Sequence, residues 1–342
     1  MIPKKVLILY GAPGSGHAQV ASALAQAINK TPGWMAHEDH LLRHWPALGG
    51  LLLRLYRWVL GHMAGAWGRL HGNPRYLAMA RRAESVLYGL DIFRIQKILD
   101  RHQPHLVIAV HVLPLRCLAV LKAGGKFSLP LYAVITDFWA HSYWPVAGVE
   151  RYFASSKCSA DDLIAGGVPA RRVAITGIPL REEFRSHPSK IYCRLRTNFD
   201  PIRKLILVMG GRYGIFPFEE LLEAAMNVSV ARQWQWAFVF GGNDRALRRA
   251  RENLPPEESR RIRLTGFLED MAPLMAASDL LITKAGGSTL AEALACGVAM
   301  ILCRPIPGQE EGNARFLVSL GAALRADTAG VALQMAAGLL QS

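Results

Sequence analysis

The chain has few cysteines, no membrane-length apolar run and no motif for binding a metal ion. Its five cysteines among 342 residues include no Cys-x-x-Cys pair, which disfavours a disulfide framework or a zinc site and favours a reducing compartment. No run of about 18 uncharged apolar residues occurs, so no membrane-spanning helix is predicted. A signal-peptide cleavage site and an Asp-x-Asp motif are both absent. We therefore expect a cytoplasmic protein whose chemistry needs no metal and no cofactor.

What the chain does have is a globular composition with a basic surplus. Hydrophobic residues make up 51% of it and charged residues 19%, which predicts a sizeable core, and the length suits two domains. The formal net charge is +14, and residues 1–184 hold 21 Lys and Arg against 11 Asp and Glu. This basic first half indicates an anionic partner surface, either nucleic acid or anionic lipid. No nucleic-acid-binding module is recognisable, so we expect no nucleic-acid partner.

Short apolar runs alternate with helical patterns along the whole chain, which is typical of parallel α/β sheets. The pattern predicts two Rossmann-like domains, at residues 1–183 and 204–342, joined by a polar linker at 184–203. The strands predicted in the first domain are Val6–Tyr10, Leu106–Val110, Leu131–Thr136, Arg151–Ala154 and Val173–Thr176. Those predicted in the second domain are Lys204–Met209, Trp236–Gly241, Arg261–Thr265, Leu280–Thr283 and Ala299–Leu302. Ligands of such sheets bind beyond the carboxyl ends of the strands, where all the glycine-rich segments of this chain lie.

The segment 284–313 combines an anion-binding turn with well-placed carboxylates. A strand ends in Gly286-Gly-Ser-Thr289 and runs directly into a helix, so backbone N–H groups and the positive helix end face a bound anion. Glu292 follows one turn into the helix, and Gln309-Glu310 follows a second strand. A phosphate cradle followed by groups that accept hydrogen bonds from hydroxyls fits a nucleotide-sugar. The loop Gly210-Gly-Arg-Tyr-Gly214 can hold a diphosphate in the same way.

The first strand is followed by Gly11-Ala-Pro-Gly-Ser-Gly-His17, which is neither a Gly-x-Gly-x-x-Gly fingerprint nor a P-loop. A helix begins at His17, and a positive helix end lowers an imidazole pKa, which favours the neutral ring able to accept a proton. The alternative is a simple turn in which the histidine caps the helix. Residues 136–144, Thr-Asp-Phe-Trp-Ala-His-Ser-Tyr-Trp, form a dense aromatic and polar cluster after another strand.

Together these segments resemble the GT-B glycosyltransferases of the monogalactosyldiacylglycerol synthase, processive diacylglycerol glucosyltransferase and MurG group, glycosyltransferase family 28. The resemblance extends from about residue 5 to residue 325. It implies an α/β GT-B fold, with two Rossmann-like doubly wound domains and a cleft between them. It also implies an inverting transfer of glucose or galactose from a UDP-sugar to diacylglycerol or a glycolipid. One departure is Gly286-Gly-Ser where the family usually reads Gly-Pro-Gly.

The resemblance also assigns roles to single residues. His17 is implied as the catalytic base, with Asp137 orienting a base or binding the acceptor hydroxyl. The alternative for Asp137, taken from the residues alone, is the N-cap of a following turn. Trp139 and Trp144 are implied to border an acyl-chain groove. The implied donor-binding residues for the diphosphate are Gly210, Gly211, Arg212, Gly287, Ser288 and Thr289. Phe267 is implied for the uracil ring, Glu292 for the ribose hydroxyls, and Gln309 with Glu310 for the hexose hydroxyls.

Residues 40–90 hold seven Arg, one Glu, four His and three Trp. Arg54, Arg57 and Trp58 stand among leucines, which describes a basic amphipathic segment able to lie in a lipid headgroup layer. The alternative is a buried helical hairpin. Because the family has its membrane-facing region here, we expect a peripheral protein on an anionic membrane, at the inner face of the cell membrane.

Three other activities remain compatible with these motifs. A MurG-like enzyme would transfer N-acetylglucosamine to a polyprenyl-linked acceptor, although the Thr-Asp-Phe-Trp element argues against it. A UDP-sugar 2-epimerase would share the fold but needs further acid–base groups. A non-catalytic, membrane-bound UDP-sugar sensor would keep the donor site alone.

Overall fold

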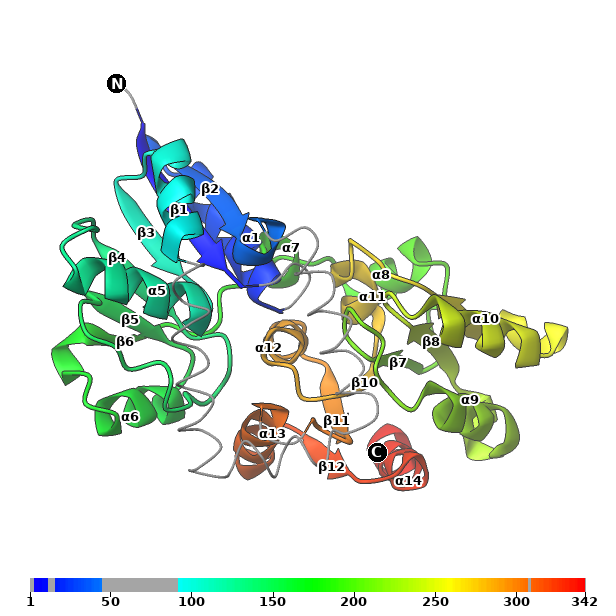
Figure 1. Ribbon diagram of the computed structural model, residues 1–342. Coiled ribbons are helices and arrows are strands. Elements are labelled where there is room, and N and C mark those ends of the chain that lie inside the picture. Colours follow the sequence, from blue (N-terminus) through cyan, green and yellow to red (C-terminus); the bar gives the residue numbers. More distant parts are fainter. Residues whose placement is uncertain (1–2, 12–15, 45–91, 307–308, 342) are drawn as a thin grey trace. The chain divides into compact units, whose positions relative to one another are not determined.

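The computed structural model describes residues 3–11, 16–44, 92–306 and 309–341, and the chain divides into two compact units (Figure 1). The first unit spans Met1–Arg181 and the second Glu182–Ser342. Each unit is built on a six-stranded sheet whose paired strands are all parallel. The α/β class and the two-sheet organisation predicted from the sequence are therefore confirmed.

The first unit has the strand order β2-β1-β3-β4-β5-β6. Its elements are β1 (Lys4–Tyr10), α1 (Gly16–Asn29), β2 (Trp34–His40), η1 (Leu41–His44), a helical stretch at 92–102, β3 (Leu106–Ala109), α5 (Val112–Ala123), β4 (Leu131–Val134), β5 (Arg151–Ala154), α6 (Lys157–Ala165), η2 (Ala170–Arg172) and β6 (Val173–Ile175). Strand β2, at the edge of the sheet, was not among the strands predicted from the sequence.

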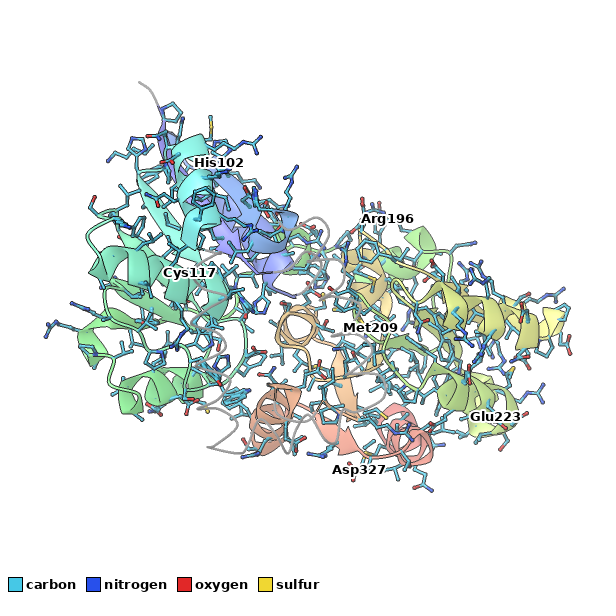
Figure 2. All side chains as sticks on the ribbon, viewed as in Figure 1. His102, Cys117, Arg196, Met209, Glu223 and Asp327 are labelled. Carbon is cyan, nitrogen blue, oxygen red and sulfur yellow. The ribbon has the colours of Figure 1, made fainter. Side chains whose placement is uncertain are left out.

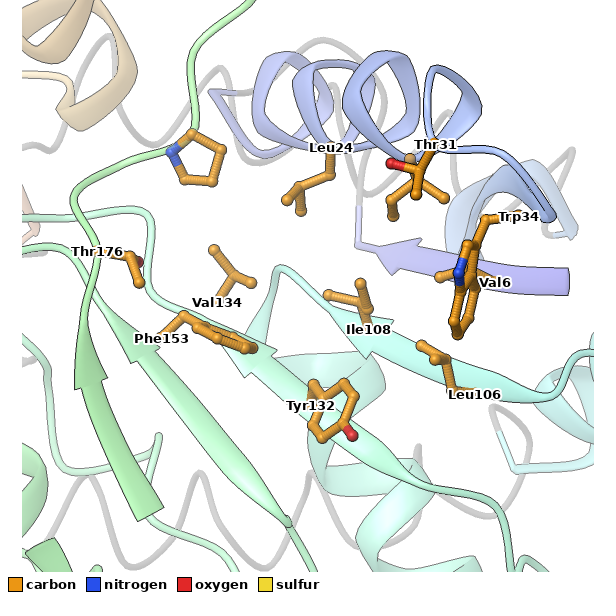
Figure 3. A pocket seen from close by; sticks show the side chains of 12 residues that line it. Val6, Leu24, Thr31, Trp34, Leu106, Ile108, Tyr132, Val134, Phe153 and Thr176 are labelled. Carbon is orange, nitrogen blue, oxygen red and sulfur yellow. The ribbon is translucent and has the colours of Figure 1, made fainter. Parts of the chain in front are cut away.

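Side chains alternate between the two faces of this sheet, as the period of a strand requires. One set, with Leu7, Val107 and Ala133, packs in a core with residues of α5, α6 and the 92–102 helix. The opposite set, with Val6 and Ile108, faces the side where α1 lies. There the sheet and α1 border an open apolar pocket of about 440 Å³ (Figure 3). Its lining residues are Val6, Leu24, Ile28, Thr31, Trp34, Leu106, Ile108, Tyr132, Val134, Phe153, Thr176 and Pro179.

The second unit has the strand order β12-β11-β10-β7-β8-β9. Its elements are α7 (Glu182–Arg185), α8 (Lys190–Arg196), β7 (Leu205–Met209), α9 (Phe218–Asn227), η3 (Val230–Gln233), β8 (Gln235–Val239), α10 (Asp244–Asn253), η4 (Pro256–Arg260), β9 (Ile262–Thr265), α11 (Ala272–Ala277), β10 (Leu280–Thr283), α12 (Gly287–Ala295), β11 (Ala299–Cys303), α13 (Gln309–Ser319), β12 (Leu324–Ala326) and α14 (Ala329–Gln341). The short strand β12 was not predicted.

The segment predicted as a linker, residues 184–203, holds the end of α7 and the whole of α8 and belongs to the second unit. Its helix α8 packs against α11. The guanidinium of Arg194 is buried and forms an ion pair with Asp279. It also donates to the backbone carbonyl oxygens of Ala277 and Pro201, each at 2.9 Å. Arg194 thus docks helix α8 onto the second unit.

None of the helices within the described residues is long and apolar enough to cross a membrane.

Candidate active site

His17 lies at the carboxyl edge of the first sheet, where three adjacent strands end. It is the second residue of α1 and follows β1, while His111 follows β3 and Thr136 follows β4. The Nδ1 atom of His17 is 2.9 Å from the Thr136 hydroxyl oxygen. The rings of His17 and His111 meet edge to face, with their centroids 4.7 Å apart. Residues separated by up to 119 positions are therefore brought together by the parallel topology.

Both histidines are held in the neutral form. Burial lowers the pKa of His17 from 6.5 to about 4, and a hydrogen bond to the Val110 backbone opposes this only in part. Burial, followed by the nearby His17 and His141 rings, lowers the pKa of His111 well below its ordinary value. At neutral pH each ring therefore has one nitrogen able to accept a proton. The sequence predicted a neutral His17 from the helix end, whereas desolvation is the larger cause here.

The backbone around these rings is fitted closely. His111 caps the start of α5, because its Nδ1 accepts a hydrogen bond from the Leu113 N–H at 3.1 Å. A Cβ atom on Gly11 would lie 2.8 Å from the same Nδ1. A larger residue at Gly11 would push the His111 ring out of its place, so the glycine serves ring packing as well as the turn.

The segment 136–144 is anchored through its backbone to the start of α6. The Ser155 hydroxyl donates to the carbonyl oxygen of Asp137, and the Ser156 hydroxyl donates to that of Phe138 at 2.6 Å. The Ala140 N–H donates to a carboxylate oxygen of Asp162 at 2.9 Å. These contacts hold the backbone of the residues that follow Thr136, and Asp137 is partly exposed there.

The aromatic residues of this segment divide between core and surface. Trp144 is 2% exposed and packs in the apolar core of the first unit. Trp139 is partly exposed and lies edge-on to His141, with centroids 6.0 Å apart. Of the two tryptophans predicted to border an acyl chain, only Trp139 can meet a ligand without repacking the core.

In the second unit, the predicted donor-binding segments follow the neighbouring strands β7, β10 and β11. Figure 2 labels Met209, the last residue of β7, and the glycine loop begins directly after it. Gly211 and Gly214 have φ angles of +69° and +59°, which L side chains rarely adopt. A Cβ atom on Gly214 would lie 1.9 Å from the Phe240 carbonyl oxygen. The loop is therefore tightly turned and held against the adjacent end of β8.

Helix α12 begins at the predicted phosphate-binding turn. Gly286 is its N-cap and supplies no side chain to cap the first N–H groups. The Ser288 hydroxyl oxygen is buried and has no hydrogen-bond partner among the described residues. Buried hydroxyls are usually paired, so this one points to a polar ligand or water at the helix start. Thr289 is half-buried, and Glu292, one turn further on, is 8% exposed.

Arg212 and Phe267 meet at the other side of the glycine loop. The guanidinium carbon of Arg212 lies 4.8 Å from the centroid of the Phe267 ring, which is a cation–π distance. Both side chains are exposed. The pair places an aromatic face and a positive charge together, which suits a base and a phosphate of one nucleotide.

The structure adds one residue that motif analysis did not single out. Lys284, the first residue after β10, forms an ion pair with Glu310 near the start of α13. Glu310 is 5% exposed, and its other carboxylate oxygen accepts a hydrogen bond from the Ile306 N–H at 3.0 Å. Lys284 is 26 positions from Glu310 and belongs to no periodic pattern, so the sequence does not predict the pair. Its position directly after a predicted strand is the one signal that could have marked it as a site residue.

Four predicted site residues fall outside what can be placed. Arg54, Arg57 and Trp58 lie in 45–91, beyond the described residues. Gln309 begins α13, but its side chain is not among those described.

Comparison with known families gives one match for each unit. Residues 17–180 match the monogalactosyldiacylglycerol (MGDG) synthase family. Residues 205–340 match the C-terminal domain of glycosyltransferase family 28. The two matches cover the first-unit histidines and the second-unit glycine loops respectively.

Similar individual proteins are found at both sequence and structural level. A processive diacylglycerol beta-glucosyltransferase of Bacillus cytotoxicus is 31% identical over 330 residues, covering 94% of this chain and 81% of the relative. The Bacillus subtilis protein of the same name is 29% identical over 322 residues, covering 94% and 83%.

Among solved structures, the S. aureus MnaA–UDP complex has a TM-score of 0.63 at 14% identity, covering 99% of this chain and 88% of that one. MurG of Acinetobacter baumannii has a TM-score of 0.58 at 15% identity, covering 99% and 91%. These likenesses confirm the GT-B fold.

Proposed function

The chain belongs to the glycosyltransferase family that includes the monogalactosyldiacylglycerol synthases and the processive diacylglycerol β-glucosyltransferases, and from this premise we propose that it glycosylates a membrane lipid. It is a UDP-sugar-dependent glycosyltransferase. The sugar is a hexose, glucose or galactose, and the acceptor is the hydroxyl of diacylglycerol or of a glycolipid. The observation that carries the proposal is that the first unit matches the monogalactosyldiacylglycerol synthase family and the second unit matches the C-terminal domain of glycosyltransferase family 28.

The second unit is proposed to bind the UDP-sugar. Glycine loops after β7 and β10 offer backbone N–H groups, and Arg212 adds a positive charge beside the exposed Phe267 ring. The unpaired Ser288 hydroxyl supports a ligand at the start of α12. Glu292 and Glu310 supply carboxylates suited to ribose and hexose hydroxyls, with Gln309 beside them in sequence.

The chemical step is proposed to be an inverting displacement with His17 as base. The acceptor oxygen attacks the anomeric carbon while His17 takes the hydroxyl proton, and the bond to the UDP oxygen breaks with its electron pair. The 2.9 Å contact with Thr136 supports this role, because a hydroxyl group already reaches the ring at the distance that proton transfer needs.

Departure of UDP is proposed to need no metal ion. Positive charge from Arg212 and Lys284, together with backbone N–H groups, is available for the developing negative charge. Activity in a chelator such as EDTA, compared with activity in added Mg²⁺, tests this directly. A loss of turnover in EDTA that Mg²⁺ restores would contradict it.

The acceptor chemistry also supports attachment to a membrane surface, and we propose a peripheral position at the inner face of the cell membrane. Diacylglycerol stays within a bilayer, so an enzyme that uses it must approach the headgroup layer. The basic surplus of the first half suits an anionic layer.

One incubation series tests the proposed function. Purified protein is mixed with diacylglycerol vesicles and, separately, UDP-glucose, UDP-galactose or UDP-N-acetylglucosamine. Lipid products are then separated, and the anomeric configuration of the sugar is determined by NMR. We expect a β-hexosyl lipid from UDP-glucose or UDP-galactose, since inversion of an α-linked donor gives that anomer. Transfer of N-acetylglucosamine to a polyprenyl-linked acceptor alone would indicate a MurG-like enzyme. UDP binding without any transfer would indicate a sensor.

A further inference from the structure

Lys284, in the loop after β10, is a partly buried cation for which no motif provides a role. Its ammonium pairs with the Glu310 carboxylate, and the two side chains are only 20% and 7% exposed. Strands β10 and β11 are neighbours, so the pair joins the segments that follow two adjacent strands. Within the described part of the chain, Glu310 is the one carboxylate with which Lys284 forms an ion pair.

The lysine stem also runs past the glycine loop of β7. A Cβ atom on Gly211 would lie 3.2 Å from Cε and 3.9 Å from Nζ of Lys284. The lysine stem therefore lies beside the loop that is suited to a diphosphate, with its ammonium at the same edge. Its other neighbour is the carboxylate suited to a hexose.

The Glu310 carboxylate is itself placed like a bound anion. Oε1 contacts Lys284 and Oε2 accepts from the Ile306 N–H at 3.0 Å. A Cβ atom on Gly286, the N-cap of α12, would lie 3.8 Å from the same Oε1. One negative charge thus already lies beside the lysine and near the positive end of a helix.

We propose that Lys284 binds the diphosphate of the nucleotide-sugar and gives up its ion pair with Glu310 when the donor arrives. This assignment rests on the proposed function, because it needs a UDP-sugar in the second unit. A diphosphate has more negative charge than one carboxylate and can also accept from the N–H groups of the Gly210–Gly211 loop, so it competes for the ammonium. The Oε1 atom of Glu310 is then released to accept a hexose hydroxyl. Binding of the diphosphate and recognition of the sugar are coupled in this way.

The test compares ligands that differ only in phosphate or sugar. Affinities of UDP-glucose, UDP and uridine are measured by calorimetry on wild type, Glu310→Gln and the double variant Lys284→Met/Glu310→Gln. Lys284→Met alone would leave the buried Glu310 carboxylate without its charged partner. The double variant removes both charges and is therefore used instead. A thermal unfolding curve for each variant shows that it is folded.

We expect Glu310→Gln to bind UDP at least about fivefold more tightly than wild type, since the lysine no longer has a competing carboxylate. Adding Lys284→Met to that variant should weaken UDP binding about tenfold to a hundredfold, the usual worth of a charged hydrogen bond. Uridine affinity should stay the same in all three proteins. Glu310→Gln should also lose most of the extra affinity that glucose gives UDP-glucose over UDP.

Two results would overturn the assignment while leaving the proposed function intact. One is equal UDP affinity in Glu310→Gln and the double variant, which would mean that Lys284 does not touch the diphosphate. The other is UDP binding that Glu310→Gln leaves unchanged or weaker, which would mean that the two groups do not exchange. Wild-type protein that binds neither UDP nor uridine would instead overturn the proposed function, and this assignment with it.

Discussion

The imidazole of His17 is kept neutral by burial rather than by a charged neighbour, so it can accept a proton at neutral pH. Removing it should therefore lower the rate of the chemical step. We expect His17→Ala to lower kcat by about 10²–10⁴-fold, the usual worth of general-base catalysis. UDP affinity should be unchanged, because the groups suited to UDP belong to the second unit. Steady-state kinetics with lipid acceptor and UDP calorimetry measure the two. If turnover stays near normal, Asp137 becomes the preferred base.

The lowered pKa of His17 also predicts a pH dependence of stability. Its pKa is about 4 in the folded protein against 6.5 for an ordinary histidine, so the unfolded chain binds the proton first as pH falls. The free energy of unfolding should therefore decrease from about pH 6.5 down to about pH 4. His111 adds a change in the same direction. In His17→Gln this decrease should be less steep, as measured by urea unfolding at several pH values. Parallel curves for the two proteins would contradict the assigned shift.

Glu292 is a buried carboxylate on α12, where a ribose hydroxyl would gain a charged acceptor. Glu292→Ala should weaken UDP-sugar binding by about 1.5–3 kcal/mol, with kcat less affected. Glu292→Gln, which keeps the shape and an acceptor oxygen, is the matched control and should lose less. A donor KM that is unchanged in a folded Glu292→Ala protein would show that the ribose contact lies elsewhere.

For single residues, the sequence could predict those that belong to motifs. It could not predict Lys284, which belongs to none. The glycine loops, His17 and Glu292 could be proposed as site residues because turn chemistry and strand ends have local patterns. The Lys284–Glu310 ion pair depends on two adjacent strands and becomes visible only in three dimensions. The same holds for the cause of the His17 pKa, since burial by distant segments has no local pattern.

Among elements, the strands buried on both faces were the most predictable. Strand β7, for example, is an unbroken apolar run of five buried residues. Strand β2 was missed because it is an edge strand with the sequence Trp-Met-Ala-His-Glu-Asp-His, which has little apolar character. Its buried Asp39 is satisfied by His44 and His102, partners that are 5 and 63 positions away. Strand β12 has only three residues, which is too short for any period to show.

The ion pair between Arg194 and Asp279 is expected to hold helix α8 onto the second unit. Arg194→Met should lower the free energy of unfolding by roughly 1.5–3 kcal/mol, because Asp279 loses its buried partner and keeps only the more exposed Lys190 as an ion-pair partner. Arg196→Met in the same helix is the control: Arg196 and Asp270 are both more than half exposed and 3.7 Å apart, so about 0–1 kcal/mol is expected. Denaturant unfolding of both variants measures the difference. Equal effects would mean that the ion pair does not dock the helix.

The formal charge of the whole molecule is +14, and most of the surplus lies in residues 1–184. We expect reversible binding to anionic vesicles that weakens as salt rises, since the attraction between exposed charges is screened. Co-sedimentation with phosphatidylglycerol vesicles at several salt concentrations measures it. Binding that ignores salt would show that electrostatic attraction is not the cause.

The contribution of the segment 40–90 to this binding can be separated from that of net charge alone. Replacing Arg54 and Arg57 with glutamate should reduce both vesicle binding and activity on lipid, while UDP affinity stays the same. The matched control replaces Arg245 and Arg248, which are exposed on α10 in the second unit and have the same spacing. It makes the same change in net charge, so it separates a local contact from a general one. Equal losses in both variants would assign vesicle binding to total charge, and no loss in either would place Arg54 and Arg57 away from the membrane.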